Sequence, residues 1–299
     1  MLDLKGCGTA LATPFTQSGA LDEKALRRFV DFQIDGGIDF LVPCGTTGES
    51  ATLTEEEHLR VVEIVVDQTK HRVPVIGGAG GNNTAHIVDL AKKVESLGAD
   101  GILSVSPYYN KPTQEGLYQH FKAIADSVTV PIVIYNVPGR TAGNIAPDTV
   151  VRLAGIKNII AVKEASGSMD QITEIAARVP DGFRVFSGDD SMTVPIMSVG
   201  GMGIISVASN EIPGEMSELA RHCLNDDYAS AQKLNKRLLP IMKINFIETS
   251  PIPVKAALAM MGLMTESYRL PLVPLAQENR NKLKAVLESM NLIPAAAVR

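Results

Sequence analysis

The chain has 299 residues, of which 45% are hydrophobic and 20% charged, and its formal net charge is −5. This much apolar material excludes a disordered chain, and the lack of any lysine and arginine cluster argues against a nucleic-acid binder. No apolar stretch reaches the ~18–20 residues of a membrane-spanning helix, so neither a membrane nor a nucleic acid is an expected partner.

The N-terminus and the cysteines predict a cytoplasmic protein. The first residues, MLDLKGCGTALATPF, lack the basic start, apolar centre and small-residue cleavage site of a signal peptide. The three cysteines are odd in number and widely spaced, as is typical of free thiols in a reducing compartment: Cys7, Cys44 and Cys223.

Short apolar runs alternate with longer helical segments along most of the chain. Each run is almost continuously apolar, as expected of parallel strands that helices cover. Helical periodicity follows over 22–36, 54–69 and 84–97, and the second of these segments opens with a capping box of Thr54 and Glu57. The eight predicted strands are 7–14, 39–44, 74–79, 101–107, 131–137, 158–164, 183–187 and 203–208.

Such a series of strand–helix units can close into a barrel or open into a doubly wound sheet. A dinucleotide-binding open sheet would need Gly-x-Gly-x-x-Gly after its first strand, and the nearest match, Gly78-Ala79-Gly80, has Asn at position 83. We therefore predict an α/β fold, a (β/α)8 TIM barrel over 1–224. Residues 225–299 are predicted to form a C-terminal three-helix extension, with helices at 226–246, 251–263 and 275–291 and no strand between them.

Active sites of such barrels lie at the C-terminal ends of the strands, so the polar residues there are the candidates. Among them Lys163 ends an apolar strand, and alternation places it on the same face as Ala161. If that face is the barrel interior, burial lowers the pKa of the amine, and a neutral amine can attack a carbonyl to form an imine. The strand pattern alone does not separate this from a lysine that extends into solvent.

Three further positions suit the same chemistry. Tyr135 ends the adjacent strand, where a phenol can transfer protons, although an ordinary core tyrosine is the alternative. Thr46 and Thr47 lie in a glycine-flanked turn that suits a carboxylate, or they form a plain turn. Arg140 follows a Pro-Gly turn and suits a second carboxylate through paired N–H groups, or it is a surface arginine.

A metal site is not expected. The five histidines form no His-x-x-x-His pair, and the cysteines form no Cys-x-x-Cys pair. Asp189 and Asp190 could attract a divalent ion, but we interpret them as a solvated loop.

Several motifs in order along the chain carry a family resemblance. They are GTTGES at 45–50, SPYYNKP at 106–112, YNVPGRT at 135–141, VKEASG at 162–167, SGDD at 187–190, GGMGIISVASN at 200–210 and SPIPVKAAL at 250–258. From residue 6 to about residue 290 the chain resembles the dihydrodipicolinate synthase family, within the pyruvate-dependent class I aldolase or N-acetylneuraminate lyase superfamily.

The resemblance implies a cytoplasmic lyase of lysine and diaminopimelate biosynthesis, which condenses pyruvate with L-aspartate 4-semialdehyde. It implies no metal and no organic cofactor, because pyruvate is held as an imine on Lys163. The tyrosine matched by Tyr109 reaches into the neighbouring subunit in that family, which implies a homodimer, commonly paired into a homotetramer. The implied roles are Lys163 as Schiff-base lysine; Tyr135, Thr46 and Tyr109 as proton relay; Thr47 at the pyruvate carboxylate; Arg140 at the semialdehyde carboxylate; and Gly188 and Ile205 as backbone lining of the pyruvate pocket.

An effector site for lysine also maps onto the chain by this resemblance. In lysine-inhibited members a carboxylate faces the ammonium of the effector, and His86 replaces it here. Glu55 stands where those members often carry a histidine. We therefore expect weak or absent inhibition by lysine. The matched positions are Ser50, Ala51, Glu55, His58, Asn82, His86 and Tyr108.

Three other functions compete with this interpretation. An N-acetylneuraminate or keto-deoxy sugar-acid lyase would share Lys163 and Tyr135, but it is not expected to keep the PGRT sequence around Arg140. A non-catalytic barrel that senses a keto acid would show no turnover. A phosphate-binding barrel isomerase would need a glycine-rich loop after strands seven and eight, whereas 200–203 precedes the eighth strand.

Overall fold

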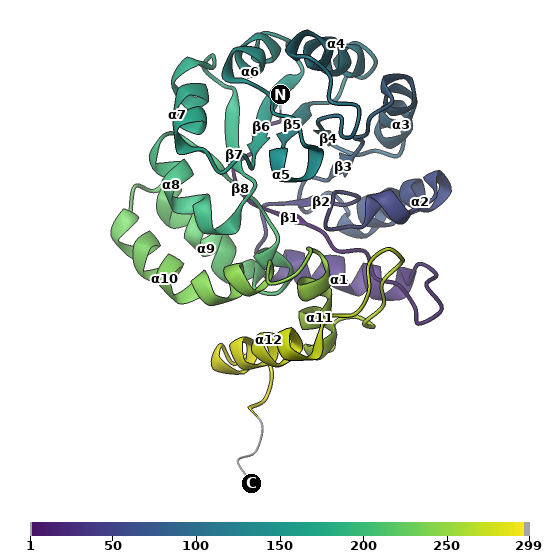
Figure 1. Ribbon diagram of the computed structural model, residues 1–299, viewed down its shortest axis with the longest axis vertical. Helices are drawn as coiled ribbons and strands as arrows, with labels where there is room; N and C mark the ends of the chain where they lie inside the picture. The colour runs from purple at the N-terminus through teal and green to yellow at the C-terminus, as the bar shows by residue number, and fades with distance from the viewer. Residues whose placement is uncertain (1, 296–299) are drawn as a thin grey trace.

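The computed structural model describes residues 2–295, and its core is a ring of parallel strands. The strand order is β2-β1-β8-β7-β6-β5-β4-β3, and a parallel bridge between Leu41 and Val75 joins β2 to β3. The prediction of a closed barrel rather than an open sheet is therefore confirmed (Figure 1). The strands are β1 (Gly6–Ala10), β2 (Phe40–Val42), β3 (Ile76–Gly78), β4 (Gly101–Val105), β5 (Ile132–Asn136), β6 (Ile159–Glu164), β7 (Arg184–Ser187) and β8 (Gly203–Ser206).

Helices surround the ring and cover the outer face of the strands (Figure 1). The predicted capping box begins α2, since Glu57 N–H donates to Thr54 Oγ1 at 3.2 Å and Thr54 N–H donates to Glu57 Oε2 at 3.0 Å. The short helix α5 (Pro138–Thr141) lies over the ring in this view. The others are α1 (Glu23–Asp35), α2 (Glu55–Thr69), α3 (Thr84–Ser96), α4 (Gln114–Ala125), α6 (Pro147–Ala154), α7 (Met169–Arg178), α8 (Thr193–Ser198) and α9 (Pro213–Leu224), with 3-10 turns η1 (Ser50–Thr52), η2 (Asp190–Met192) and η3 (Ala208–Asn210).

The three predicted C-terminal helices are present as α10 (Tyr228–Ile244), α11 (Ile252–Met260) and α12 (Gln277–Ser289). They lie beside α1 and α9, outside the ring (Figure 1). The predicted boundary after residue 224 falls between α9 and α10. One hydrophobic cluster runs across it, joining Ala220, Leu238 and Leu283, so the division into two domains stays a prediction.

A second and smaller cluster fills the inside of the barrel. Its side chains include Phe40, Val133, Ala161, Phe186 and Ile205. Alternate residues of a strand share a face, and Ala161 belongs to this cluster. The side chain of Lys163, two residues later, therefore also points to the interior. Within residues 2–295 no helix is both long and apolar enough to cross a membrane.

Candidate active site

Lys163 lies at the end of β6 and is buried. It stands opposite Tyr135 of β5 and Phe186 of β7 in the ladder, and its side chain is only 5% exposed. Burial lowers its pKa to about 8; the carboxylate of Asp190 opposes this shift and the guanidinium of Arg140 adds to it. The lysine therefore does not extend into solvent. About a tenth of such an amine is neutral at pH 7, far more than of an ordinary lysine.

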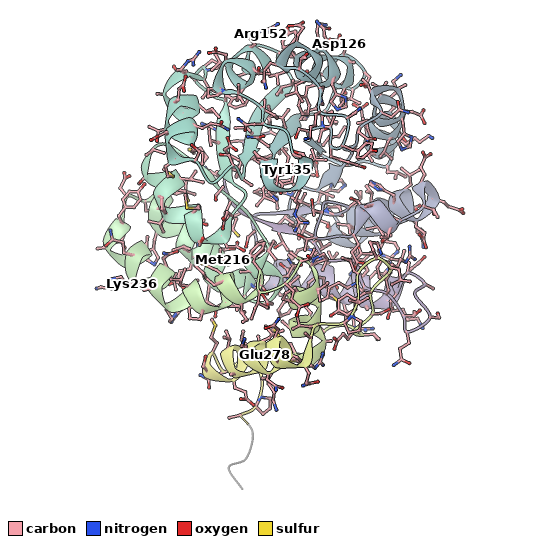
Figure 2. The ribbon with its side chains drawn as sticks, viewed as in Figure 1. Asp126, Tyr135, Arg152, Met216, Lys236 and Glu278 are labelled. Carbon is pink, nitrogen blue, oxygen red and sulfur yellow. The ribbon has the colours of Figure 1, made fainter. Side chains whose placement is uncertain are left out.

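Tyr135 is the immediate neighbour of this amine. Lys163 Nζ lies 4.4 Å from the centroid of the Tyr135 ring. Figure 2 labels this tyrosine inside the ring of helices. Burial raises the pKa of Tyr135 to about 12, so its phenol keeps its proton and can donate it. An amine that becomes neutral and a phenol that stays protonated form a pair suited to proton transfer.

Gly188 and Ile205 complete the surroundings of the amine. A methyl group on Cα of Gly188 would lie 3.1 Å from Lys163 Cε and 2.8 Å from Ala165 Cβ, so only glycine leaves room here for the lysine side chain. Ile205 on β8 is 1% exposed and belongs to the interior cluster. Gly188 therefore lies beside Lys163, and Ile205 lies in the interior of the barrel.

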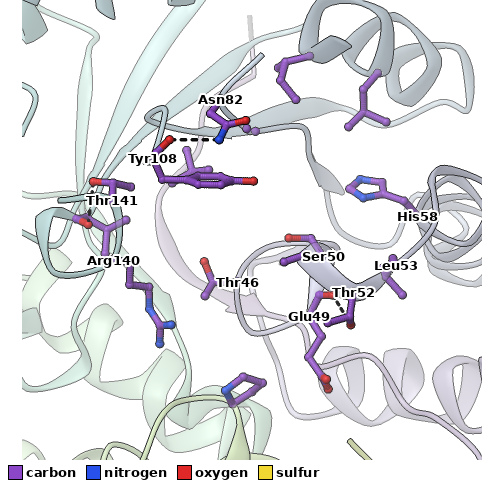
Figure 3. Close-up of a pocket in the computed structure, with 18 of the residues that line it drawn as sticks. Thr46, Glu49, Ser50, Thr52, Leu53, His58, Asn82, Tyr108, Arg140 and Thr141 are labelled. Atoms are coloured by element: carbon purple, nitrogen blue, oxygen red, sulfur yellow. Dashed lines mark hydrogen bonds between the residues drawn. The ribbon is translucent and has the colours of Figure 1, made fainter. Parts of the chain in front are cut away.

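A cavity of about 580 Å³ opens above the strand ends, and Thr46 and Arg140 line it together (Figure 3). Thr47, in the same turn as Thr46, is buried. Arg140 is exposed on α5, and its Nη2 donates to the carbonyl oxygen of Ser250 at 3.1 Å. The cavity thus offers both hydroxyl groups and a guanidinium, which suits a substrate that carries carboxylates.

Tyr109 is the one proposed relay residue that the structure does not bring to this site. Its side chain is 90% exposed, its φ is +72°, and it does not line the cavity. The neighbouring Tyr108 does line it. Within a single chain Tyr109 is therefore available to a partner rather than to Lys163.

All seven residues matched to the effector site line the same cavity, and Figure 3 labels four of them, Ser50, His58, Asn82 and Tyr108. Glu55 is already paired, because Lys93 Nζ donates to its Oε1 at 2.6 Å and His86 Nδ1 lies 3.7 Å from its Oε2. His58 is buried with its Nε2 2.7 Å from the carbonyl oxygen of Gly78, and burial lowers its pKa. The carboxylate of Glu55 is thus already paired with the ammonium of Lys93 from the same chain.

The interpretation of Asp190 as part of a solvated loop is wrong. Its side chain is 1% exposed, Ser206 Oγ donates to it at 2.6 Å and Ala208 N–H donates to it at 2.9 Å. Burial raises its pKa to about 6. Asp190 therefore ties η2 to the end of β8, because a carboxylate in an apolar layer needs hydrogen-bond donors.

Sequence reasoning also missed Glu164. Its side chain points away from the face of Lys163, where Oε1 accepts from Asn136 Nδ2 and Oε2 accepts from Gln171 Nε2, both at 2.9 Å. The signal was a polar residue at the end of an apolar strand on the face that helices cover. In residues 2–295 no group of histidine, cysteine, aspartate or glutamate side chains is arranged to hold a metal ion.

Comparison with known proteins finds similar proteins over nearly the whole chain. The model of the dihydrodipicolinate synthetase family matches residues 3–290. A 4-hydroxy-tetrahydrodipicolinate synthase of Koribacter versatilis is 55% identical over 298 residues, 99% of each chain. The crystal structure of dihydrodipicolinate synthase from Aquifex aeolicus is 48% identical, with a TM-score of 0.95 over 97% of this chain and 99% of that one. A dihydrodipicolinate synthase from Cyanidioschyzon merolae, solved with lysine bound, is 36% identical, with a TM-score of 0.95 over 98% and 100% of the two chains.

Proposed function

The chain belongs to the dihydrodipicolinate synthetase family and is a lyase of the 4-hydroxy-tetrahydrodipicolinate synthase type, and we propose that Lys163 is its Schiff-base residue. The observation that supports this role is a buried amine with a lowered pKa beside a buried phenol. The enzyme condenses pyruvate with L-aspartate 4-semialdehyde. The sugar-acid lyase and the non-catalytic barrel are disfavoured, because relatives at 50–55% identity over nearly the whole chain carry the synthase name.

The reaction needs only the groups of this chain and its substrates. The neutral amine of Lys163 attacks the keto carbon of pyruvate, and the carbinolamine loses water to give an imine. Loss of a methyl proton gives an enamine, whose carbon attacks the aldehyde of the semialdehyde. The substrate amine then displaces Lys163 from the imine and closes the ring. We propose no metal and no organic cofactor, because the imine nitrogen accepts the electron pair.

The other residues hold substrates and move protons in this proposal. Tyr135 and Thr46 pass protons to and from the carbinolamine, with Tyr109 contributed by a partner subunit. Thr47 binds the pyruvate carboxylate, next to backbone groups of Gly188 and Ile205. Arg140 binds the carboxylate of the semialdehyde through paired N–H groups.

Trapping with borohydride tests the assignment directly. Reduction in the presence of pyruvate is expected to fix a three-carbon adduct on Lys163 and so block cleavage by trypsin after this residue. The modified peptide then runs from Asn158 to Arg178. Turnover of pyruvate with aspartate semialdehyde, and not with sugar aldehydes, completes the test. Absence of an adduct, or an adduct on another lysine, would contradict the proposal.

The exposed Tyr109 supports a homodimer, and we propose that dimers pair further into a homotetramer in the cytoplasm. Tyr109 is 90% exposed and Tyr108 beside it is 41% exposed, so a partner subunit can reach this pair of tyrosines. Crosslinking of a cysteine introduced at Tyr109 to a partner subunit tests the arrangement. A monomer with full activity would contradict it.

The rate of pyruvate trapping is expected to rise with pH and to level off above about 8. The neutral form of Lys163 is the nucleophile, and its fraction increases as the pH rises through the pKa of about 8. Initial rates with cyanoborohydride at pyruvate concentrations far below saturation measure this profile, because such rates report the ionisation of the free enzyme. A midpoint near 10, the value of an ordinary lysine, would show that burial does not lower the pKa.

Replacement of Arg140 by alanine is expected to raise the KM for aspartate semialdehyde by about 10–100-fold, the equivalent of one charge-assisted pair of hydrogen bonds. Half-saturation of trapping by pyruvate is expected to change less, because the carboxylate of pyruvate is assigned to Thr47 and not to Arg140. Steady-state kinetics with each substrate varied measure the difference. Arg152→Ala, which removes an exposed arginine paired with Glu115, is the matched control. Equal effects on both substrates would argue against the assignment.

Lysine at millimolar concentration is expected to inhibit weakly or not at all. His86 replaces the carboxylate that would receive the effector's ammonium, and Glu55 is occupied by Lys93. The variant His86→Glu is expected to gain sensitivity to lysine. Turnover measured with and without lysine in both proteins checks this, and strong inhibition of the unchanged protein would refute it.

A further inference from the structure

A buried ion pair connects the turn of Thr46 and Thr47 to the C-terminal helices. Lys255 Nζ on α11 donates to Glu49 Oε1, and the two side chains are 0% and 1% exposed. The ammonium lies 4.3 Å from the ring centroid of Phe15 and 5.6 Å from that of Tyr268. Two charges this deeply buried depend on each other, because loss of either leaves the other without its counter-charge.

The backbone of Glu49 belongs to the turn that presents the two threonines. Its N–H donates to the carbonyl oxygen of Thr46 at 3.1 Å, and its φ is +53°. On the barrel side, Thr13 Oγ1 donates to the carbonyl oxygen of Gly48 at 2.7 Å. The turn is thus bound to the barrel through Gly48 and to α11 through Glu49, which are consecutive residues.

Contacts from the same C-terminal region surround this turn. Arg269 forms two hydrogen bonds of 2.6 Å to the carboxylate of Glu57 and also donates to the carbonyl oxygen of Thr52 at 2.9 Å. Just before α11, the carbonyl oxygen of Ser250 accepts from Arg140. The C-terminal region therefore contacts both Arg140 and the segment that carries Thr46 and Thr47, and the pair of Lys255 and Glu49 is a buried contact to this segment.

We propose that Lys255 and Glu49 are positioning residues that hold Thr46 and Thr47 at the distance needed to bind the carboxylate of pyruvate. The side chains of Lys255 and Glu49 are 0% and 1% exposed, so the effect is expected to pass through the backbone of the turn. The inference rests on the proposed function, since it assumes that the threonines meet a 2-keto acid. Loss of the pair is expected to weaken pyruvate binding more than semialdehyde binding, which depends on Arg140.

The test separates positioning from stability by removing one charge and then both. Lys255→Met and Glu49→Gln each leave a buried charge unpaired, so both are expected to lower the Tm. The double variant has no unpaired charge and is expected to recover most of the Tm, although its turn is still unanchored. In the double variant the pyruvate concentration that half-saturates borohydride trapping is expected to rise about ten-fold or more. The KM for semialdehyde is expected to stay within about two-fold.

Asn245→Ala is the matched control. Asn245 Nδ2 donates to Glu211 Oε2 at 2.5 Å, a buried contact that also joins the barrel to the C-terminal helices but does not touch residues 45–52. This variant is expected to lower the Tm and to leave the half-saturation by pyruvate unchanged. A folded double variant that binds pyruvate as well as the unchanged protein would overturn the positioning role alone. Failure of the unchanged protein to trap pyruvate would instead overturn the proposed function.

Discussion

Replacement of Lys163 by methionine is expected to abolish the pyruvate adduct and to lower kcat by about 10³-fold or more, as for loss of a covalent nucleophile in other enzymes. Methionine fills a similar volume but cannot form an imine. The Tm is expected to stay the same or to rise, because the substitution removes an amine that is 5% exposed and costly to desolvate. Mass spectrometry after borohydride reduction, steady-state kinetics and thermal unfolding provide the three measurements.

The matched control is Lys157→Arg, an exposed residue six positions upstream that keeps the trypsin site. This variant is expected to form the adduct at Lys163 at the normal rate. If the methionine variant keeps substantial turnover, another amine carries the imine. If it unfolds, the lysine has a structural role that its lowered pKa does not indicate.

Replacement of Tyr135 by phenylalanine is expected to lower kcat by about 10²–10⁴-fold, the usual contribution of a group that transfers protons. Phenylalanine keeps the ring that Lys163 Nζ contacts at 4.4 Å, so the surroundings of the amine are preserved. Only the hydroxyl is lost, and with it the proton that its raised pKa retains. The adduct is therefore expected to form slowly but to the full extent, which a time course of trapping measures.

Tyr228→Phe is the control for loss of a phenol in general. Tyr228 donates to the carbonyl oxygen of Met197 at 3.0 Å, on the outer side of the barrel. Loss of this hydrogen bond is expected to lower the free energy of unfolding by about 0.5–1.5 kcal/mol without a change in kcat. An equal loss of kcat in both tyrosine variants would assign the effect to packing rather than to proton transfer.

The local pattern of the sequence was sufficient for the fold and for the central residue of the site. Continuous apolar runs marked every strand, since both faces of a barrel strand are covered, and alternation put Lys163 on the same face as Ala161. Chain order placed Tyr135 beside it, because consecutive strands of a barrel are neighbours in space. Burial of the lysine remained open until the structure, because strand alternation does not distinguish the inside of a barrel from the outside.

What the sequence by itself determined about this protein is therefore its regular part: the number and order of strands, the outer helices and the C-terminal helices, all set by short-range periodicity. Only the tertiary structure decided which polar groups are buried away from solvent. It paired Glu49 with Lys255, which stand 206 positions apart, and buried Asp190 under donors from the end of β8. It also left Tyr109 exposed on its loop. These outcomes depend on which distant side chains meet in a low-dielectric space, and no local period in the sequence encodes that meeting.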